Sequence, residues 1–236
     1  MNEVLYILCS ILILPVMIFA ISASVKVRRI FDKHNTTYNE NNFTAGEVAR
    51  AILDRAGLQH IAIKPIEGSL TDNYNPKEKT VFLSRSVIDS RSVAAIGVAA
   101  HESGHAIQHS TGYIPLKLRS ALVPYAQIGS QLALPLLIIA FIFQGSAMIM
   151  PKAAEYLISA ALILFAATTL FTFVTLPVEF NASRRAKQIL QQGEILNAKE
   201  LSIAGKVLNA AAQTYVASFA ISLLQLLRFF FLFRRR

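Results

Sequence analysis

His101 and His105 lie four residues apart with Glu102 directly after the first, in the pattern H-E-x-x-H. On a helix, residues i and i+4 project from the same face, so both imidazoles can reach one Zn²⁺ at about 2.0–2.1 Å. Glu102 points to the adjoining side, where a carboxylate can take a proton from water at the metal. The pattern predicts a zinc-dependent hydrolase with two histidine ligands and a glutamate base. The plainer alternative is a pair of ordinary surface histidines on a helix.

The residues before this pattern favour the helix that it needs. Ser92 is a candidate N-cap, and residues 93–100 are small and apolar, which suits a buried helix. A second helix is predicted earlier in the chain, where Thr44 and Glu47 form a capping-box pattern and Gly57 ends the apolar period.

Two strands are predicted between these helices. Residues 60–66 and 80–84 are rich in β-branched side chains, and residues 71–77 between them have the composition of a turn. A small sheet therefore precedes the histidine helix. In zinc peptidases an edge strand beside the metal can pair with an extended substrate, and residues 80–84 are the candidate for that role. They could equally form an internal strand.

The composition indicates an integral membrane protein, because 54% of the 236 residues are hydrophobic. Residues 4–25, 121–143 and 156–178 carry no charge and are long enough to cross a hydrocarbon core, which takes about 20 helical residues. A fourth run, 207–233, contains polar side chains and is predicted to cross the membrane or to lie in its interface. The single cysteine, Cys9, excludes an intrachain disulfide and a cysteine-based zinc site.

The basic residues set the expected orientation. No basic residue precedes the first apolar run, whereas residues 26–29 are rich in Lys and Arg, so this run is predicted to be an uncleaved anchor with its end in the cytoplasm. Residues 28–119 then form a cytoplasmic catalytic domain. Two further crossings place residues 145–155 outside and residues 179–206 in the cytoplasm. The chain is predicted to be a multi-pass protein of the plasma membrane.

The net charge of +9 raises the question of a nucleic-acid partner. The basic residues flank the apolar runs and gather at residues 234–236, a pattern that fits anionic lipid head groups better than a phosphodiester backbone. The predicted partners are therefore the lipid bilayer and a substrate, and not a nucleic acid. The sequence does not indicate an oligomeric state.

A catalytic zinc site takes three protein ligands and leaves the fourth position to water. No histidine follows His109, so the third ligand must be a carboxylate. Glu155 is predicted on the opposite side of the membrane, and Glu194 and Glu200 lie in a polar stretch that reads as solvated. Glu179 lies at the cytoplasmic boundary of the third apolar run and is the leading candidate. Its competing interpretation is a glutamate at the start of a helix, where it would favour the helix dipole.

Four stretches carry a resemblance to a known family: residues 72–76, 82–84, 98–108 and 176–186. They strongly resemble the YugP-type membrane zinc metallopeptidases, from about residue 72 to the fourth apolar run. They are more distantly similar to the HtpX and CAAX-processing membrane peptidases, which pair H-E-x-x-H with a later glutamate ligand in an E-x-x-A context. The resemblance implies that Glu179, with Ala182, supplies this ligand.

The chain departs from these patterns at three positions. The HtpX-like pattern has an aspartate where this chain has Ser183, so the orientation of a ligand histidine would fall to a hydroxyl or to another residue. The YugP-like pattern often has aspartate where this chain has Asn75 and Asn181. The predicted zinc ligands themselves are unaffected.

Together these observations predict a mainly α, integral membrane fold with three to four transmembrane helices and a cytoplasmic, zincin-like α+β catalytic domain. The predicted activity is a zinc endopeptidase of the gluzincin type, with one Zn²⁺ per chain on His101, His105 and Glu179. Its substrates would be peptides or membrane proteins, cleaved at the cytoplasmic face.

The residue that stabilises the oxyanion is left open among His109, Arg184 and Arg185. Each of the three also has an ordinary interpretation, as a surface histidine or a membrane-flanking cation. The alternative function is a non-proteolytic membrane scaffold or adaptor with a structural or degenerate zinc site. A transporter is disfavoured, because the apolar runs carry no charged residue that would mark an ion pathway.

Overall fold

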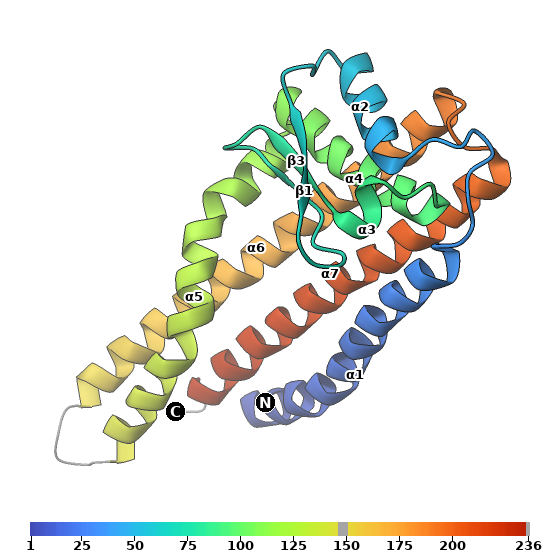
Figure 1. Cartoon of the computed structure of the whole chain (residues 1–236). Coiled ribbons are helices and arrows are strands. Elements are labelled where there is room, and N and C mark those ends of the chain that lie inside the picture. Colours follow the sequence, from blue (N-terminus) through green and yellow to red (C-terminus); the bar gives the residue numbers. More distant parts are fainter. Residues whose placement is uncertain (146–150, 235–236) are drawn as a thin grey trace. The chain divides into compact units, whose positions relative to one another are not determined.

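The computed structural model describes residues 1–145 and 151–234; residues 146–150, part of the predicted connection 145–155, lie outside the described residues. Long helices dominate the described part, with one small sheet in the first half of the chain (Figure 1). In chain order the elements are α1 (Asn2–His34), α2 (Ala45–Arg55), β1 (Ala62–Ile66), β2 (Asn73–Asn75), β3 (Thr80–Ser84), α3 (Arg85–Ile88), α4 (Val93–Ser110), α5 (Ile114–Gly145), α6 (Pro151–Gln192) and α7 (Ala198–Phe233).

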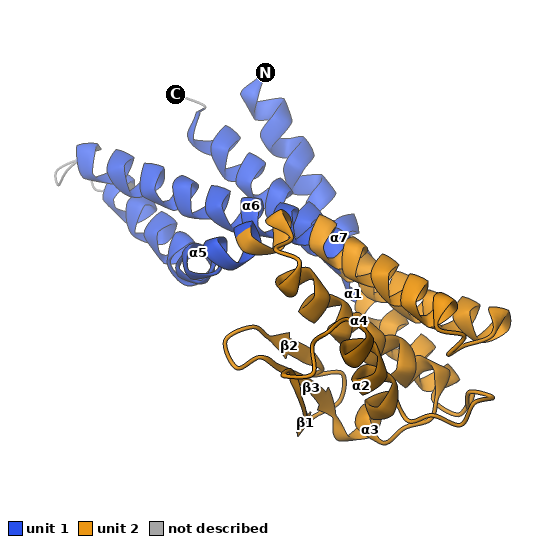
Figure 2. Ribbon diagram, turned by 90° about the horizontal axis from the view of Figure 1, so that it is seen from above, with its two compact units in different colours: residues 1–21, 118–176, 215–236 blue, residues 22–117, 177–214 orange. Residues whose placement is uncertain are grey.

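The chain divides into two compact units, coloured separately in Figure 2. Unit 1 comprises Met1–Ile21, Leu118–Leu176 and Tyr215–Arg236, and unit 2 comprises Ser22–Lys117 and Pro177–Thr214. Apart from Met1 and Arg234, the described residues of unit 1 lie in segments of α1, α5, α6 and α7, the four described helices that are long and apolar enough to cross a membrane. The predicted mainly helical fold with a small sheet is therefore confirmed.

Unit 1 presents apolar side chains outward, as suits contact with lipid. On α1, for example, Ile11 and Ile18 are exposed. Hydroxyl groups bond between two of its helices: the Oγ atoms of Thr172 on α6 and Ser222 on α7 lie 2.8 Å apart. Such bonds between helices are typical of membrane bundles, where polar side chains find partners on neighbouring helices.

The sheet of unit 2 has the order β1-β3-β2. The central strand, β3, pairs with β1 in parallel and with β2 antiparallel. Of the two alternatives for residues 80–84, the internal strand is therefore confirmed and the edge strand is excluded. The edge strands are β1 and β2. The second of these lies within residues 71–77, which were predicted only as a turn.

The core of unit 2 forms where α4 contacts α2, α3 and the strands β2 and β3. Val81 and Leu83 of the sheet and Ile96 of α4 are fully buried in it, and each such side chain contributes about 1.5–3 kcal/mol by leaving water. Both predicted helix caps are confirmed. Thr44 forms the reciprocal capping box of α2, and the side chain of Ser92 accepts a bond from a backbone N–H in the first turn of α4.

Small residues let α4 approach α6 and α7 closely. A Cβ atom added to Gly104 would lie 3.0 Å from the carbonyl oxygen of Ala182 on α6. A Cβ atom added to Gly97 would lie 3.3 Å from the Cβ atom of Ala204 on α7. The glycine inside H-E-S-G-H therefore has a packing role, because it brings the histidine helix against the helix that carries Glu179.

Candidate metal centre

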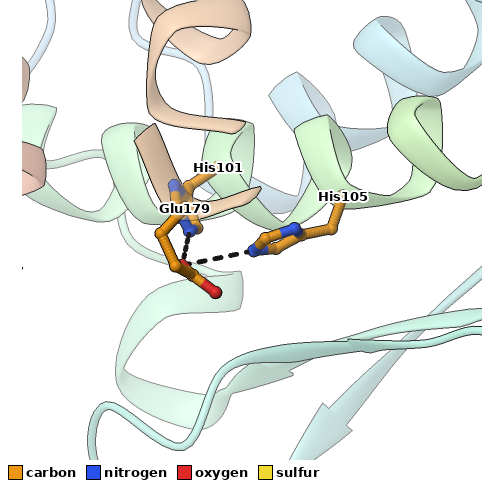
Figure 3. A group of neighbouring side chains, drawn as sticks. All are labelled: His101, His105 and Glu179. Carbon is orange, nitrogen blue, oxygen red and sulfur yellow. Dashed lines mark hydrogen bonds and ion pairs between the residues drawn. The ribbon is translucent and has the colours of Figure 1, made fainter. Parts of the chain in front are cut away.

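Two helices of unit 2 supply the candidate metal ligands. His101 and His105 project from one face of α4, and Glu179 projects toward them from α6 (Figure 3). Glu179 lies in the interior of α6, which continues through Pro177 from Pro151 to Gln192. The interpretation of Glu179 as a residue at a helix start is therefore wrong. The carboxylate is almost fully buried, with 2% of the residue exposed.

The three side chains have the spacing of ligands around one small cation. The Oε2 atom of Glu179 lies 3.2 Å from the Nε2 atom of His101 and 3.6 Å from the Nε2 atom of His105. One ligand atom from each of the three residues lies within 4.8 Å of the others. Tetrahedral zinc with bonds of 2.0–2.2 Å separates its ligand atoms by about 3.3–3.6 Å, so the set fits the ion. No other group of this kind is found in the part of the chain that the structure describes.

Glu102 lies beside this group and is itself buried, with 9% of the residue exposed. Burial raises the pKa of the Glu102 carboxyl above its usual value. The positive charge of protonated histidines would oppose this rise, whereas the negative charges of Glu179 and Asp72 add to it. A raised pKa brings a carboxyl closer to neutral pH, where a general base transfers protons efficiently.

Asp72, which immediately precedes β2, adds negative charge near the site. Its Oδ1 atom accepts bonds from the backbone N–H and the hydroxyl of Ser84, at 2.7 and 3.1 Å, so the side chain is held against the end of β3. Burial raises the pKa of the Asp72 carboxyl, and the bonds from Ser84 oppose the rise. Asp72 was not predicted as a site residue, although it lies in one of the stretches that carry the family resemblance.

Each histidine of the group has a partner at Nδ1, the ring nitrogen away from Glu179. The Oγ atom of Ser183 lies 3.1 Å from His101 Nδ1, the position that a hydroxyl orienting this histidine would take. The Oε1 atom of Gln108 lies 3.0 Å from His105 Nδ1. Gln108 was not predicted as a site residue, although its place three residues after His105, on the same side of the helix, is a usable signal.

The three oxyanion candidates lie in different surroundings. His109 is exposed, and its Nδ1 atom lies 2.9 Å from the hydroxyl oxygen of Tyr74 on β2. The Nε atom of Arg185 donates to Asn181 at 2.8 Å, so this guanidinium is held against its own helix. Arg184 is exposed on α6. The catalytic role of all three stays a prediction.

The two remaining carboxylates of the cytoplasmic segment differ from each other. Glu194 is exposed, as the sequence predicts. Glu200 is 5% exposed, so its assignment to a solvated stretch is wrong. Its two oxygens accept the backbone N–H groups of Glu40 at 2.7 Å and of Asn197 at 2.8 Å. Glu200 therefore caps the start of α7 and anchors the segment after α1.

Comparisons with known proteins bear on this geometry. The family described as "Putative neutral zinc metallopeptidase" matches residues 9–234. The chain belongs to this family. A relative from Bacillus subtilis (strain 168), named "Putative membrane protease YugP", is 43% identical over 212 residues, which cover 89% of this chain and 90% of the relative. No solved structure matches.

Membership in this family confirms the resemblance to YugP-type proteins. The matched residues include both helices that carry the His101, His105 and Glu179 side chains, and a zinc peptidase family implies zinc as the metal. The relative is named a membrane protease, and the four long apolar helices of this chain indicate a membrane protein as well.

Proposed function

We propose that this protein is a zinc-dependent endopeptidase that hydrolyses peptide bonds at the cytoplasmic face of the membrane. The observation that carries the proposal is the convergence of His101, His105 and Glu179 beside the buried carboxyl of Glu102. Two histidines and a downstream glutamate are the ligand set of the gluzincin type. A structural zinc site gains nothing from a base beside the metal, which argues against a scaffold.

The proposed metal content is one zinc ion per chain. His101 and His105 would bind through Nε2 and Glu179 through a carboxylate oxygen, which leaves a fourth position open for catalysis. Zinc bound there supplies a Lewis acid that acidifies water and polarises a carbonyl.

Glu102 performs the proton transfers in this proposal. Its carboxylate accepts a proton from the attacking water and passes it to the amine that leaves. Because Glu102 is not one of the three ligands, it can change its protonation without releasing the metal. Burial favours its neutral form and so makes it ready to return the proton.

The edge strand β2 is the proposed place where an extended substrate would bind. This strand is an edge of the sheet and contacts α4, the helix that carries the two histidines. An edge strand can pair with a peptide through backbone hydrogen bonds, which would align the scissile bond with the site. The proposed substrates are peptides or membrane proteins that present such an extended segment.

The proposed location is the plasma membrane, with several crossings and the active site in the cytoplasm. It is supported by the basic residues 26–29, which follow the first apolar run, and by the even number of predicted crossings between α4 and the start of the segment 179–206.

The test compares the wild-type protein with the variant Glu102→Gln. The amide cannot act as a base, whereas the three ligands are unchanged. We expect zinc content to be retained and hydrolysis to fall by about 10²–10⁴-fold, the usual contribution of general acid–base catalysis. Peptides recovered from membranes with each form identify the substrates. A variant that cleaves as fast as the wild type excludes the mechanism, and wild-type protein that binds zinc but cleaves nothing supports the scaffold.

A further inference from the structure

Gln108 is a fully buried polar side chain whose neighbours come from both helices that supply the metal ligands. On α4 it follows His105 by three residues. Its Nε2 atom donates to the carbonyl oxygen of Val178 at 2.8 Å and to the Oδ1 atom of Asn181 at 2.9 Å, both on α6. Its Oε1 atom lies 3.0 Å from the Nδ1 atom of His105.

These contacts fix which end of the Gln108 amide faces which partner. The carbonyl of Val178 can only accept a hydrogen bond, so the atom beside it must be the amide nitrogen. The Asn181 side chain gives the same answer. Its Oδ1 atom also accepts from the Nε atom of Arg185 at 2.8 Å, and Arg185 can only donate. The amide oxygen is therefore the atom that faces His105.

The orientation of Gln108 determines the tautomer of His105. An amide oxygen only accepts, so the Nδ1 atom of His105 must carry the proton and donate it. A neutral imidazole protonated at Nδ1 has its lone pair at Nε2. That is the atom 3.6 Å from the Oε2 atom of Glu179, in the position of a metal ligand.

His101 is held differently. Its Nδ1 atom faces the hydroxyl of Ser183 at 3.1 Å, and a hydroxyl can donate or accept. Ser183 therefore orients the ring without selecting the tautomer, whereas the Gln108 amide admits only one tautomer of His105.

We propose that Gln108 is a positioning residue of the metal centre. It holds His105 in the tautomer that presents Nε2, and it ties α4 to the backbone of α6 at the residue immediately before Glu179. One side chain thus sets both the form of a histidine ligand and the spacing between the ligands of the two helices. This inference rests on the zinc site of the proposed function and adds a residue to it.

The first test measures the tautomer directly in metal-free protein. Gln108→Met has a similar side-chain volume but can neither accept from His105 nor donate to α6. Protein labelled with ¹⁵N-histidine in detergent is examined by two-bond ¹H–¹⁵N correlation, with the pH raised until the ¹⁵N shifts of His105 are those of a neutral imidazole. We expect wild-type His105 to be protonated at Nδ1 and the variant to gain the Nε2-protonated form. An unchanged tautomer overturns the inference.

The second readout is zinc affinity of the intact protein. Loss of a group that orients a ligand typically weakens metal binding by about 10–100-fold, and we expect Gln108→Met to fall in this range. The matched control is Gln188→Met, because Gln188 is exposed on α6. Wild-type affinity in Gln108→Met overturns the inference but not the zinc site. If the wild-type protein binds no zinc through its three ligands, the proposed function is contradicted. The tautomer of His105 in metal-free protein still tests the role of Gln108 in that case.

A second variant covers the case in which Gln108→Met does not fold. Gln108→Glu keeps an oxygen facing His105 but places another oxygen against the acceptors Val178 and Asn181. We expect this variant to keep the Nδ1-protonated tautomer while its Tm falls, which separates the two effects of Gln108. Loss of that tautomer in Gln108→Glu contradicts the inference.

Discussion

At the scale of single residues, the metal centre consists of groups with different tasks. His101, His105 and Glu179 have the spacing of ligands, whereas Glu102 is buried beside them and has the raised pKa of a base. The chemistry therefore depends on keeping the two carboxyls distinct. Glu179 must stay ionised to bind a cation, and Glu102 must take up and release a proton.

Glu179→Ala tests the third ligand. Loss of a group that orients a ligand weakens zinc binding by about 10–100-fold, and removal of a ligand itself should weaken it further. Zinc titration of the purified protein measures this. Glu194→Ala is the matched control, because Glu194 is an exposed carboxylate of the same cytoplasmic segment. Glu200 does not serve, since it is buried and caps α7. Full zinc affinity in Glu179→Ala would show that the assignment is wrong.

Asp72→Asn tests the electrostatics around the base. Glu102 acts only when it is ionised, so a raised pKa makes kcat/KM fall at a higher pH on the acid side than an ordinary glutamate would. Asparagine keeps an oxygen for the Ser84 N–H but removes a negative charge that adds to the rise. The pKa of Glu102 should then be lower, and the acid limb of kcat/KM should move to lower pH.

The profile is measured at saturating zinc, so that loss of metal at acid pH does not contribute. Glu78→Gln is the control, because Glu78 is an exposed carboxylate in the connection between β2 and β3. An acid limb of Asp72→Asn that stays in place, or moves to higher pH, contradicts the assigned influence of Asp72. The shift should be small, since Asp72 contributes least among the groups that act on Glu102.

At the scale of elements, the close approach of α4 and α6 is a condition for the site. Gly104→Ala adds a Cβ atom 3.0 Å from the backbone oxygen of Ala182, and a helix backbone cannot yield as a flexible side chain does. Overpacking of this kind costs about 1–3 kcal/mol, against a gain of about 1 kcal/mol in helix propensity. We expect a lower Tm and weaker zinc binding, because Glu179 lies one turn from Ala182.

Gly205→Ala is the control for this change. Gly205 is also inside a helix, but a Cβ atom there would meet only the Cδ atom of the flexible Lys187 side chain at 3.5 Å. This variant should keep its zinc affinity and its stability, or become slightly more stable. Equal thermal unfolding and zinc titration curves for Gly104→Ala and Gly205→Ala would remove the packing role of Gly104.

What the sequence predicted at this scale depended on local chemistry. The caps at Thr44 and Ser92 were predictable because each is a bond between residues three apart. The strand β2 was missed because Asn73 and Asn75 are typical of turns, and only pairing with β3 makes this segment extended. Gln108 was missed for the same reason, since its carbonyl partner lies 70 residues away in the chain.

At the scale of the whole molecule, the division into units follows the alternation of apolar and polar sequence. The predicted transmembrane runs supply most of unit 1, and the segments that carry the metal centre belong to unit 2. The chain therefore keeps the polar chemistry of the site out of its most apolar segments.

A contact within unit 1 indicates whether the fourth apolar run crosses the membrane. The Asn2 side chain donates to the carbonyl oxygen of Arg234 at 2.9 Å, so the start of α1 and the end of α7 lie together.

This contact favours a crossing by α7. The amino terminus is predicted outside because the basic residues 26–29 follow the first run, so Arg234 should be outside as well, although residues 234–236 are basic. Cysteine labelling in a Cys9→Ser background tests the arrangement. We expect an impermeant reagent to label Glu155→Cys and Arg234→Cys in intact cells.

Lys77→Cys and Gln192→Cys, at exposed positions of unit 2, should react only after the membrane is permeabilised. Each other outcome changes a specific part of the interpretation. If Arg234→Cys is protected while Glu155→Cys is labelled, α7 does not cross, and residues 207–233 lie in the interface. If Lys77→Cys and Gln192→Cys are accessible from opposite sides, the residues around α4 and the end of α6 do not share a compartment. Glu179 could then not complete a site with His101 and His105. The three ligands come from two helices, and both helices must place their ligands on the same side of the membrane.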